Sequence, residues 1–155
     1  MAIATVLTLT ISTAAPAQTR IERQKNSYTP EQDVQLGREA AAQVRRQMPM
    51  LDDDRTEDFV ERIGERLIDE IPSEFRQPQF RYTFEVVNLR EINAFALPGG
   101  YVYVNRGLIS AVRNEAELAG VLAHEIAHVA ERHGTEQATK AYGAQAGVEI
   151  GRAHV

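Results

Sequence analysis

The stretch His124-Glu125-Ile126-Ala127-His128 carries the strongest structural signal in this sequence of 155 residues. It lies in a segment from about Asn114 to Gly134 whose apolar residues recur at helical spacing. Residues four apart share one face of a helix, with Cβ atoms roughly 5–6 Å apart, so both imidazoles can reach one tetrahedral metal ion. Glu125 would lie beside that ion without binding it. The pattern therefore predicts a two-histidine metal site on a helix.

These residue types suit the hydrolysis of an amide bond. A zinc-dependent hydrolase needs imidazole or carboxylate ligands, an open coordination position for water, and a base close to that water. His124 and His128 are the candidate ligands of one zinc ion per chain, and Glu125 is the candidate catalytic acid/base. The alternative is a pair of hydrogen-bonded core histidines, which would leave costly buried polar groups on an apolar helix unless a metal satisfies them.

A third protein ligand is missing from the obvious positions. In one class of HExxH enzymes it is a histidine six residues after the second, where this sequence has Gly134. In the other large class it is a glutamate on a later helix. We expect this ligand to lie beyond Val155, and Glu149 and His154 are the alternatives within the sequence.

Two helices are predicted ahead of the motif. Residues 29–32 (TPEQ) supply an N-cap, a proline at the first helical position and a capping box, which starts a helix that runs to about Met48. Three aspartates at 52–54 precede a second helix, in which apolar residues recur at helical spacing until Pro72. We expect both helices to cover a sheet.

The period of the apolar residues changes from 3.6 to 2 at Phe80, which predicts a strand over residues 80–86. Residues 93–97 and 101–104 then flank Pro98-Gly99-Gly100, the pattern of a hairpin with a three-residue loop. An extended peptide could add as an antiparallel strand along the edge near residues 93–96. The alternative is an ordinary hairpin of the core.

The motif helix is expected to stop at Gly134, because glycine commonly ends helices. A last helix is expected from about Thr135. It carries three glycines at four-residue spacing, a stripe that would admit another backbone closely or simply weaken the end of the helix. They are Gly143, Gly147 and Gly151.

The N-terminal segment, residues 1–17, is uncharged and has an apolar, hydroxyl-rich core followed by an A-x-A pattern that ends at Ala17. It is typical of a secretory signal peptide, although no Lys or Arg precedes the core; the alternative is a disordered tail. Residues 18–28 are polar and expected to form a flexible lead-in, and residues 29–155 to form one domain, incomplete at its C-terminal end. We therefore expect a periplasmic or secreted protein.

Composition excludes several classes of protein. The formal net charge of −5, without a basic stripe, argues against a nucleic-acid partner. The absence of cysteine excludes disulfides, cysteine nucleophiles and a lipid anchor on cysteine. No segment is typical of a transmembrane helix. The hydrophobic content of 43% suits a soluble globular domain.

Four stretches together carry a family resemblance: residues 93–101 (NAFALPGGY), 107–109 (GLI), 117–128 (ELAGVLAHEIAH) and the pair Arg132-His133. They resemble the HtpX/BepA-type zinc metallopeptidases, a gluzincin family, and are most similar to its periplasmic BepA-like branch. The resemblance covers roughly residues 29–134.

The resemblance implies an α+β zincin-like fold, mostly helical, with one small antiparallel sheet beside the motif helix. It implies zinc bound by His124 and His128, Glu125 as catalytic acid/base, and a supporting role for Arg132-His133. The implied activity is endopeptidase action on misfolded or unassembled envelope proteins, with the outer-membrane assembly machinery as a possible partner. A non-catalytic chaperone or assembly factor, which keeps the fold but has an unfinished zinc site, is the alternative.

Overall fold

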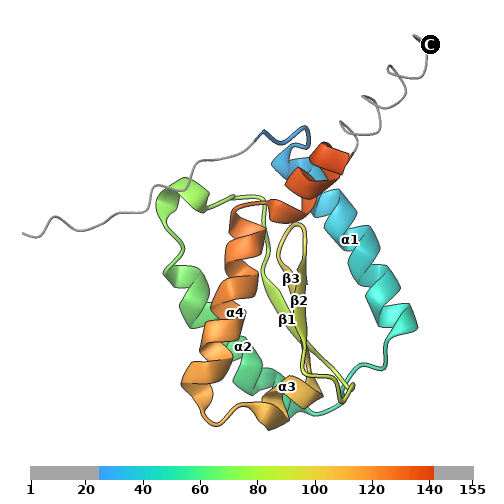
Figure 1. Cartoon of the computed structure of the whole chain (residues 1–155), viewed down its shortest axis with the longest axis vertical. Helices are drawn as coiled ribbons and strands as arrows, with labels where there is room; N and C mark the ends of the chain where they lie inside the picture. Colours follow the sequence, from blue (N-terminus) through green and yellow to red (C-terminus); the bar gives the residue numbers. More distant parts are fainter. Residues whose placement is uncertain (1–24, 142–155) are drawn as a thin grey trace, which may run out of the picture.

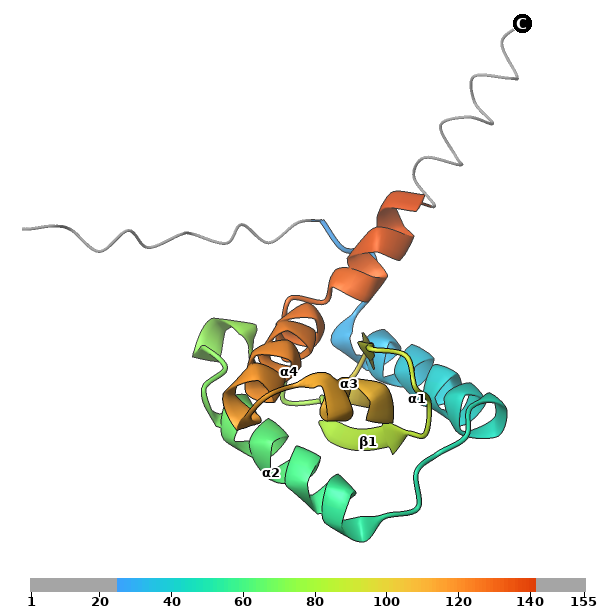
Figure 2. The ribbon, with the colours of Figure 1, turned by 60° about the horizontal axis from the view of Figure 1, so that its bottom comes forward.

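The computed structural model describes residues 25–141, which form a mixed helical and sheet domain. A three-stranded sheet lies between helix α1 on one face and helices α2 and α4 on the other (Figures 1 and 2). Glu149 and His154, the glycine stripe and residues 1–17 lie outside the described part. No helix within residues 25–141 is long and apolar enough to cross a bilayer. The elements are α1 (Pro30–Gln47), α2 (Asp54–Asp69), the 3-10 turn η1 (Ser73–Phe75), β1 (Thr83–Val87), β2 (Ala94–Leu97), β3 (Tyr101–Asn105), α3 (Arg106–Ala111) and α4 (Glu115–Ala130).

The sheet is mixed, which corrects the prediction of an antiparallel sheet. The strand order is β1-β3-β2; β3 runs antiparallel to β2 but parallel to β1. The hairpin of β2 and β3 was predicted correctly. Its second strand has Val102, Tyr103 and Val104 fully buried, whereas β2 is only half-buried. The more apolar strand therefore takes the centre of the sheet and separates β1 from β2.

The first strand begins later than its alternating sequence predicts. Phe80 is buried, but its N–H donates to the carbonyl oxygen of Gln77 at 3.0 Å, so the chain is still turning there. The ladder with β3 starts only at Thr83. The alternation of apolar residues thus predicted which side chains are buried better than it predicted the residue at which the strand begins.

Helix α1 begins at the predicted capping box. The side chain of Thr29 accepts from the backbone N–H of Gln32, and the side chain of Gln32 accepts from the backbone N–H of Thr29. Its buried positions follow one another at four-residue spacing. They are Asp33, Gly37 and Ala41.

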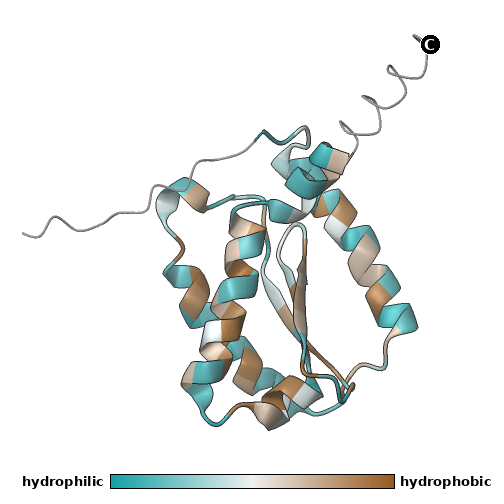
Figure 3. Cartoon of the chain, in the orientation of Figure 1, coloured by the Kyte–Doolittle hydropathy of each residue, from teal (hydrophilic) through white to brown (hydrophobic). Residues whose placement is uncertain are grey.

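The larger core lies between the sheet and the pair α2 and α4. In both helices hydrophobic and hydrophilic residues alternate along the ribbon (Figure 3). Each element contributes residues at the period expected of it, every second residue from the strands and every third or fourth from the helices. The fully buried members are Val60 from α2, Val86, Val102 and Val104 from the sheet, and Leu118 and Leu122 from α4.

Helix α4 ends at Ala130, four residues before the predicted stop at Gly134. Arg132 has a φ angle of 62°, in the left-handed region, and breaks the helix. A further helical segment then occupies residues 133–141 and contains Gly134. The prediction was wrong because it assigned the left-handed position to glycine, whereas here an arginine adopts it.

Candidate metal centre

The start of α4 is fixed by polar side chains. The side chain of Asn114 accepts from the backbone N–H of Glu117 at 3.0 Å. In turn the Glu117 carboxylate accepts from the backbone N–H of Arg113 at 2.8 Å and from the Arg113 side chain, and these bonds lower the pKa of Glu117. A charged, hydrogen-bonded carboxylate at the first turn also suits the helix dipole. The cap therefore sets where each later side chain of α4 points.

His124 and His128 lie one turn apart on α4, as predicted. Their Nε2 atoms are 2.9 Å apart and the ring centroids are 4.4 Å apart. Two nitrogens bound to a tetrahedral zinc ion at 2.0–2.1 Å would be about 3.3 Å apart. A separation of only about 0.4 Å more would therefore let both rings bind one ion, so the pair fits a zinc ion as two of its ligands.

The described residues do not complete such a site. Within residues 25–141, no group of three or more His, Cys, Asp or Glu side chains is placed to hold a metal ion. Both third-ligand alternatives inside the sequence, Glu149 and His154, fall outside that range.

Glu125 lies between the two histidines in sequence and is half-buried. Its position on the helix is about 100° around the axis from His124. Within the part of the chain that the structure describes, its carboxylate makes no hydrogen bond or ion pair. A carboxylate that is not engaged elsewhere is available to exchange a proton with a water molecule on the histidine face.

His133 approaches the site from beyond the break in the helix. Its Nδ1 is 2.7 Å from Nδ1 of His128, and its Nε2 is 2.8 Å from Oε2 of Glu131. The contact with His133 uses only Nδ1 of His128, so Nε2 of His128, which faces His124, takes no part in it. Of the predicted pair Arg132-His133, it is His133 that touches a candidate ligand.

Arg132 points to α1 instead of the histidines. Its Nε and Nη2 donate to the two carboxylate oxygens of Asp33 at 2.6 and 3.1 Å, and Nη2 also donates to the carbonyl oxygen of Tyr28 at 2.5 Å. Asp33 is 1% exposed and was not recognised from the sequence. The sequence signal that could have identified Asp33 is its position on the same face of α1 as the small residues Gly37 and Ala41.

The end of β2 lies next to the histidine face. Ala96, Leu97 and Pro98 line one small cavity together with His128 and Val129. Because β2 is the last strand in the order β1-β3-β2, its outer side has no partner strand in the described sheet. A free edge and a candidate metal ligand therefore border the same cavity.

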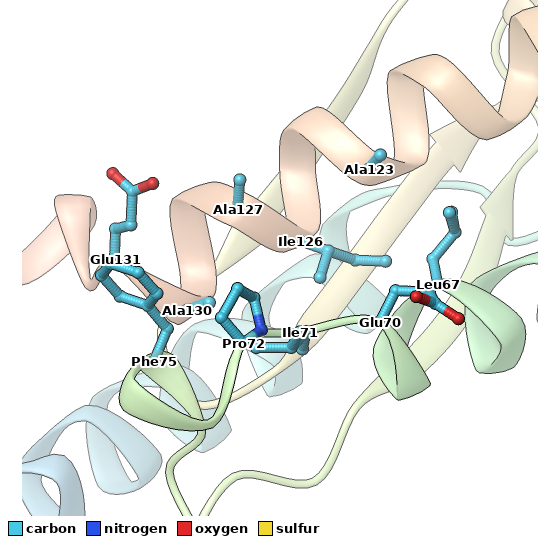
Figure 4. Close-up of a pocket in the computed structure, with 10 residues that line it drawn as sticks. All are labelled: Leu67, Glu70, Ile71, Pro72, Phe75, Ala123, Ile126, Ala127, Ala130 and Glu131. Carbon is cyan, nitrogen blue, oxygen red and sulfur yellow. The ribbon is translucent and has the colours of Figure 1, made fainter. Parts of the chain in front are cut away.

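An apolar groove of about 250 Å3 runs along another side of α4, between it and the end of α2 with η1 (Figure 4). Ala123 and Ala127, each one residue before a histidine of the pair, form part of its wall. The groove therefore opens about 100° around the helix from the imidazoles. Only two of its lining residues are charged, Glu70 and Glu131.

A known protein family matches the part of the chain that carries this arrangement. Residues 54–152 match the profile described as Peptidase family M48. This range holds the sheet, α4 and the residues of the histidine site. It covers more than half of the chain.

Curated relatives come from bacteria and from mitochondria. The beta-barrel assembly-enhancing protease of Yersinia pestis is 38% identical over 103 residues, which are 66% of this chain and 20% of that protein. The protein of the same name from Escherichia coli (strain K12) is 36% identical over 102 residues, again 66% and 20%. The mitochondrial metalloendopeptidase OMA1 of Arabidopsis thaliana is 44% identical over 55 residues, 36% and 11%. The chain spans about a fifth of the length of the bacterial relatives.

Proposed function

The chain belongs to peptidase family M48, and from this premise we propose that it is the zinc-binding part of a metalloendopeptidase with a zincin-like fold. The observation that carries the proposal is the pair of imidazole nitrogens that converge to 2.9 Å on α4. We propose His124 and His128 as two zinc ligands. The third is a carboxylate or imidazole from outside residues 25–141, from the stretch with Glu149 and His154 or from beyond Val155.

When bound, zinc supplies a Lewis acid that polarises the peptide carbonyl and activates water as a nucleophile. The chain's own part is the movement of protons. Glu125 accepts a proton from the attacking water and passes it to the nitrogen of the leaving amine. Glu125 is half-buried and its carboxylate has no other partner within residues 25–141, which suits that role.

The substrate class we propose is extended segments of misfolded or unassembled envelope proteins. The free edge of β2 beside His128 supports this class, because main-chain hydrogen bonds to an edge strand bind extended peptides of almost any sequence. The bacterial relatives are named for beta-barrel assembly, so the outer-membrane assembly machinery is the proposed partner.

We propose that the protein lies in the bacterial periplasm or outside the cell. The uncharged segment 1–17 with its A-x-A pattern supports this location. A mature N-terminus at Gln18, in protein recovered from the periplasmic fraction, is the expected observation. A cytoplasmic protein that retains residues 1–17 would contradict it.

Substitution of Glu125 by glutamine tests the catalytic proposal. We expect the variant to bind as much zinc as the parent, because Glu125 is not a ligand, and to cleave unfolded casein roughly 10²–10⁴-fold more slowly, the usual contribution of a general acid/base. Zinc content and cleavage rate are measured on the same preparations. Equal cleavage by both proteins would contradict the hypothesis that this chain is a metallopeptidase.

A non-catalytic chaperone is the second candidate function. The observation that favours it is the incomplete ligand set within residues 25–141. In that case the parent and Glu125→Gln would prevent the aggregation of an unfolded client equally well, and neither would cleave it. Cleavage by the parent alone decides for the peptidase.

A further inference from the structure

Glu131, His133 and His128 form a chain of hydrogen bonds that leads to the candidate metal position. The contacts are 2.8 Å from Glu131 Oε2 to His133 Nε2, 2.7 Å from His133 Nδ1 to His128 Nδ1, and 2.9 Å from His128 Nε2 to His124 Nε2. All four side chains come from a stretch of ten residues. Three imidazoles thus meet end to end, and a carboxylate lies at one end of the row.

Only one arrangement of the protons lets neutral rings satisfy these contacts and leaves His128 able to bind a metal. Binding through Nε2 needs a lone pair there, so the proton of His128 must be on Nδ1, from which it donates to Nδ1 of His133. His133 then carries its own proton on Nε2 and donates it to the Glu131 carboxylate. In the metal-free chain, Nε2–H of His124 donates to Nε2 of His128.

The break in the helix makes this contact possible. In a continuous helix, residues five apart are about 500° of rotation apart, or 140° after one full turn, and their side chains diverge. The φ angle of 62° at Arg132 turns the chain, so that His133 comes back over the end of α4. The ion pair with the buried Asp33 holds Arg132 in this unfavourable backbone conformation.

We propose that His133 and Glu131 are positioning residues that hold His128 in the Nδ1–H tautomer and aim its Nε2 lone pair at the metal. The inference rests on the proposed zinc site. Ligand histidines commonly donate their second ring N–H to a fixed acceptor, and loss of that acceptor costs roughly 10–100-fold in metal affinity. Here the acceptor is itself an imidazole, oriented by the carboxylate behind it.

The test measures the tautomers directly in the full-length, metal-free chain. Long-range proton–nitrogen NMR spectra are recorded at about pH 8.5, two units above the ordinary imidazole pKa of about 6.5. The parent should show His128 with its proton on Nδ1 and His124 with its proton on Nε2. The two ligands then serve as opposite references within one spectrum.

Three variants separate positioning from general stability. His133→Ala should shift His128 toward the Nε2–H tautomer and weaken zinc binding roughly 10–100-fold in a chelator competition. His133→Asn should restore both, because its side-chain oxygen can accept from Nδ1–H. Glu131→Ala removes the far end of the chain and should act in the same direction as His133→Ala. Glu74→Ala, on the exposed turn η1, is the matched control and should change neither.

Circular dichroism confirms that each variant is folded, and Glu131→Ala carries the test if His133→Ala does not fold. A parent with His128 protonated on Nε2, or a folded His133→Ala with unchanged tautomer and zinc affinity, would overturn the inference. A parent that shows both tautomers as stated but binds no zinc would instead overturn the proposed function and support the hydrogen-bond chain.

Discussion

Two glycines in helices show how far the effect of one residue depends on its surroundings. A Cβ atom at Gly37 in α1 would overlap the carbonyl oxygen of Pro98 and lie 2.8 Å from the carbonyl carbon. A Cβ at Gly120 in α4 would have no atom within 4 Å. The first glycine permits close contact between α1 and the hairpin loop, whereas the second only adds flexibility to the metal-site helix.

Alanine at these two positions should change stability in opposite directions. Gly120→Ala should raise the free energy of unfolding by about 0.5–1 kcal/mol, because glycine is a poor helix residue. Gly37→Ala should lower it by about 1–3 kcal/mol, because the obstacle is backbone that no rotamer change can move away. Urea unfolding of both variants, followed by circular dichroism, measures the difference. Two stabilising substitutions would show that α1 does not depend on this contact.

At the scale of the element, the edge strand β2 allows a test of the proposed peptide track. The N–H of Asn105 donates to the carbonyl oxygen of Asn93 at 3.0 Å, and Ala94 pairs with Val104 in the register. Hydrogen-bonding residues alternate along an antiparallel strand, so Ala94 and Ala96 direct their N–H and C=O groups away from β3. Phe95 bonds inward and is not suitable for this test.

Ala96→Pro should slow the cleavage of an unfolded substrate while zinc content stays the same. Proline removes one outward N–H and leaves the ladder with β3 intact, since edge strands tolerate proline. Ala96→Val is the matched control, because it adds comparable bulk next to α4 and retains the N–H. Cleavage rates of the three proteins are compared at equal zinc occupancy. If proline and valine have the same effect, bulk is responsible and the edge does not bind the peptide.

The elements that the sequence predicted well are those with a local chemical signal. The capping box at Thr29 and the loop at Pro98 each depend on neighbours within four residues, and both are confirmed. The parallel pairing of β1 with β3 was missed, because it depends on which strand is buried most. The end of α4 was missed because Arg132 adopts the left-handed conformation with the help of Asp33, which is 99 residues away.

In the candidate site, too, the features with a local sequence signal were predicted and those that depend on tertiary structure were missed. The spacing of His124 and His128 predicted their convergence, since both lie on one helix and no tertiary contact is needed to bring them together. The contact of His133 with His128 could not be read from spacing, because it exists only where the helix is broken.

At the scale of the whole molecule, one ion pair connects the two helical layers. Arg132 follows α4, and Asp33 belongs to α1. These two helices lie on opposite faces of the sheet (Figure 1). Their side chains are 17% and 1% exposed, so solvent screens the pair little. The Arg66–Glu115 pair between α2 and α4 is similar in chemistry but is 67% and 50% exposed.

Removal of one partner should therefore have very different costs at the two pairs. Asp33→Ala leaves a largely buried guanidinium without its carboxylate and should lower the free energy of unfolding by about 3–5 kcal/mol. Glu115→Ala should lower it by less than about 1 kcal/mol. Asp33→Ala combined with Arg132→Met should cost less than the sum of the two single changes, because no unpaired charge remains buried. Urea unfolding measures all four variants. Strict additivity, or a loss at Asp33 as small as that at Glu115, would mean that the layers are held together by apolar packing alone.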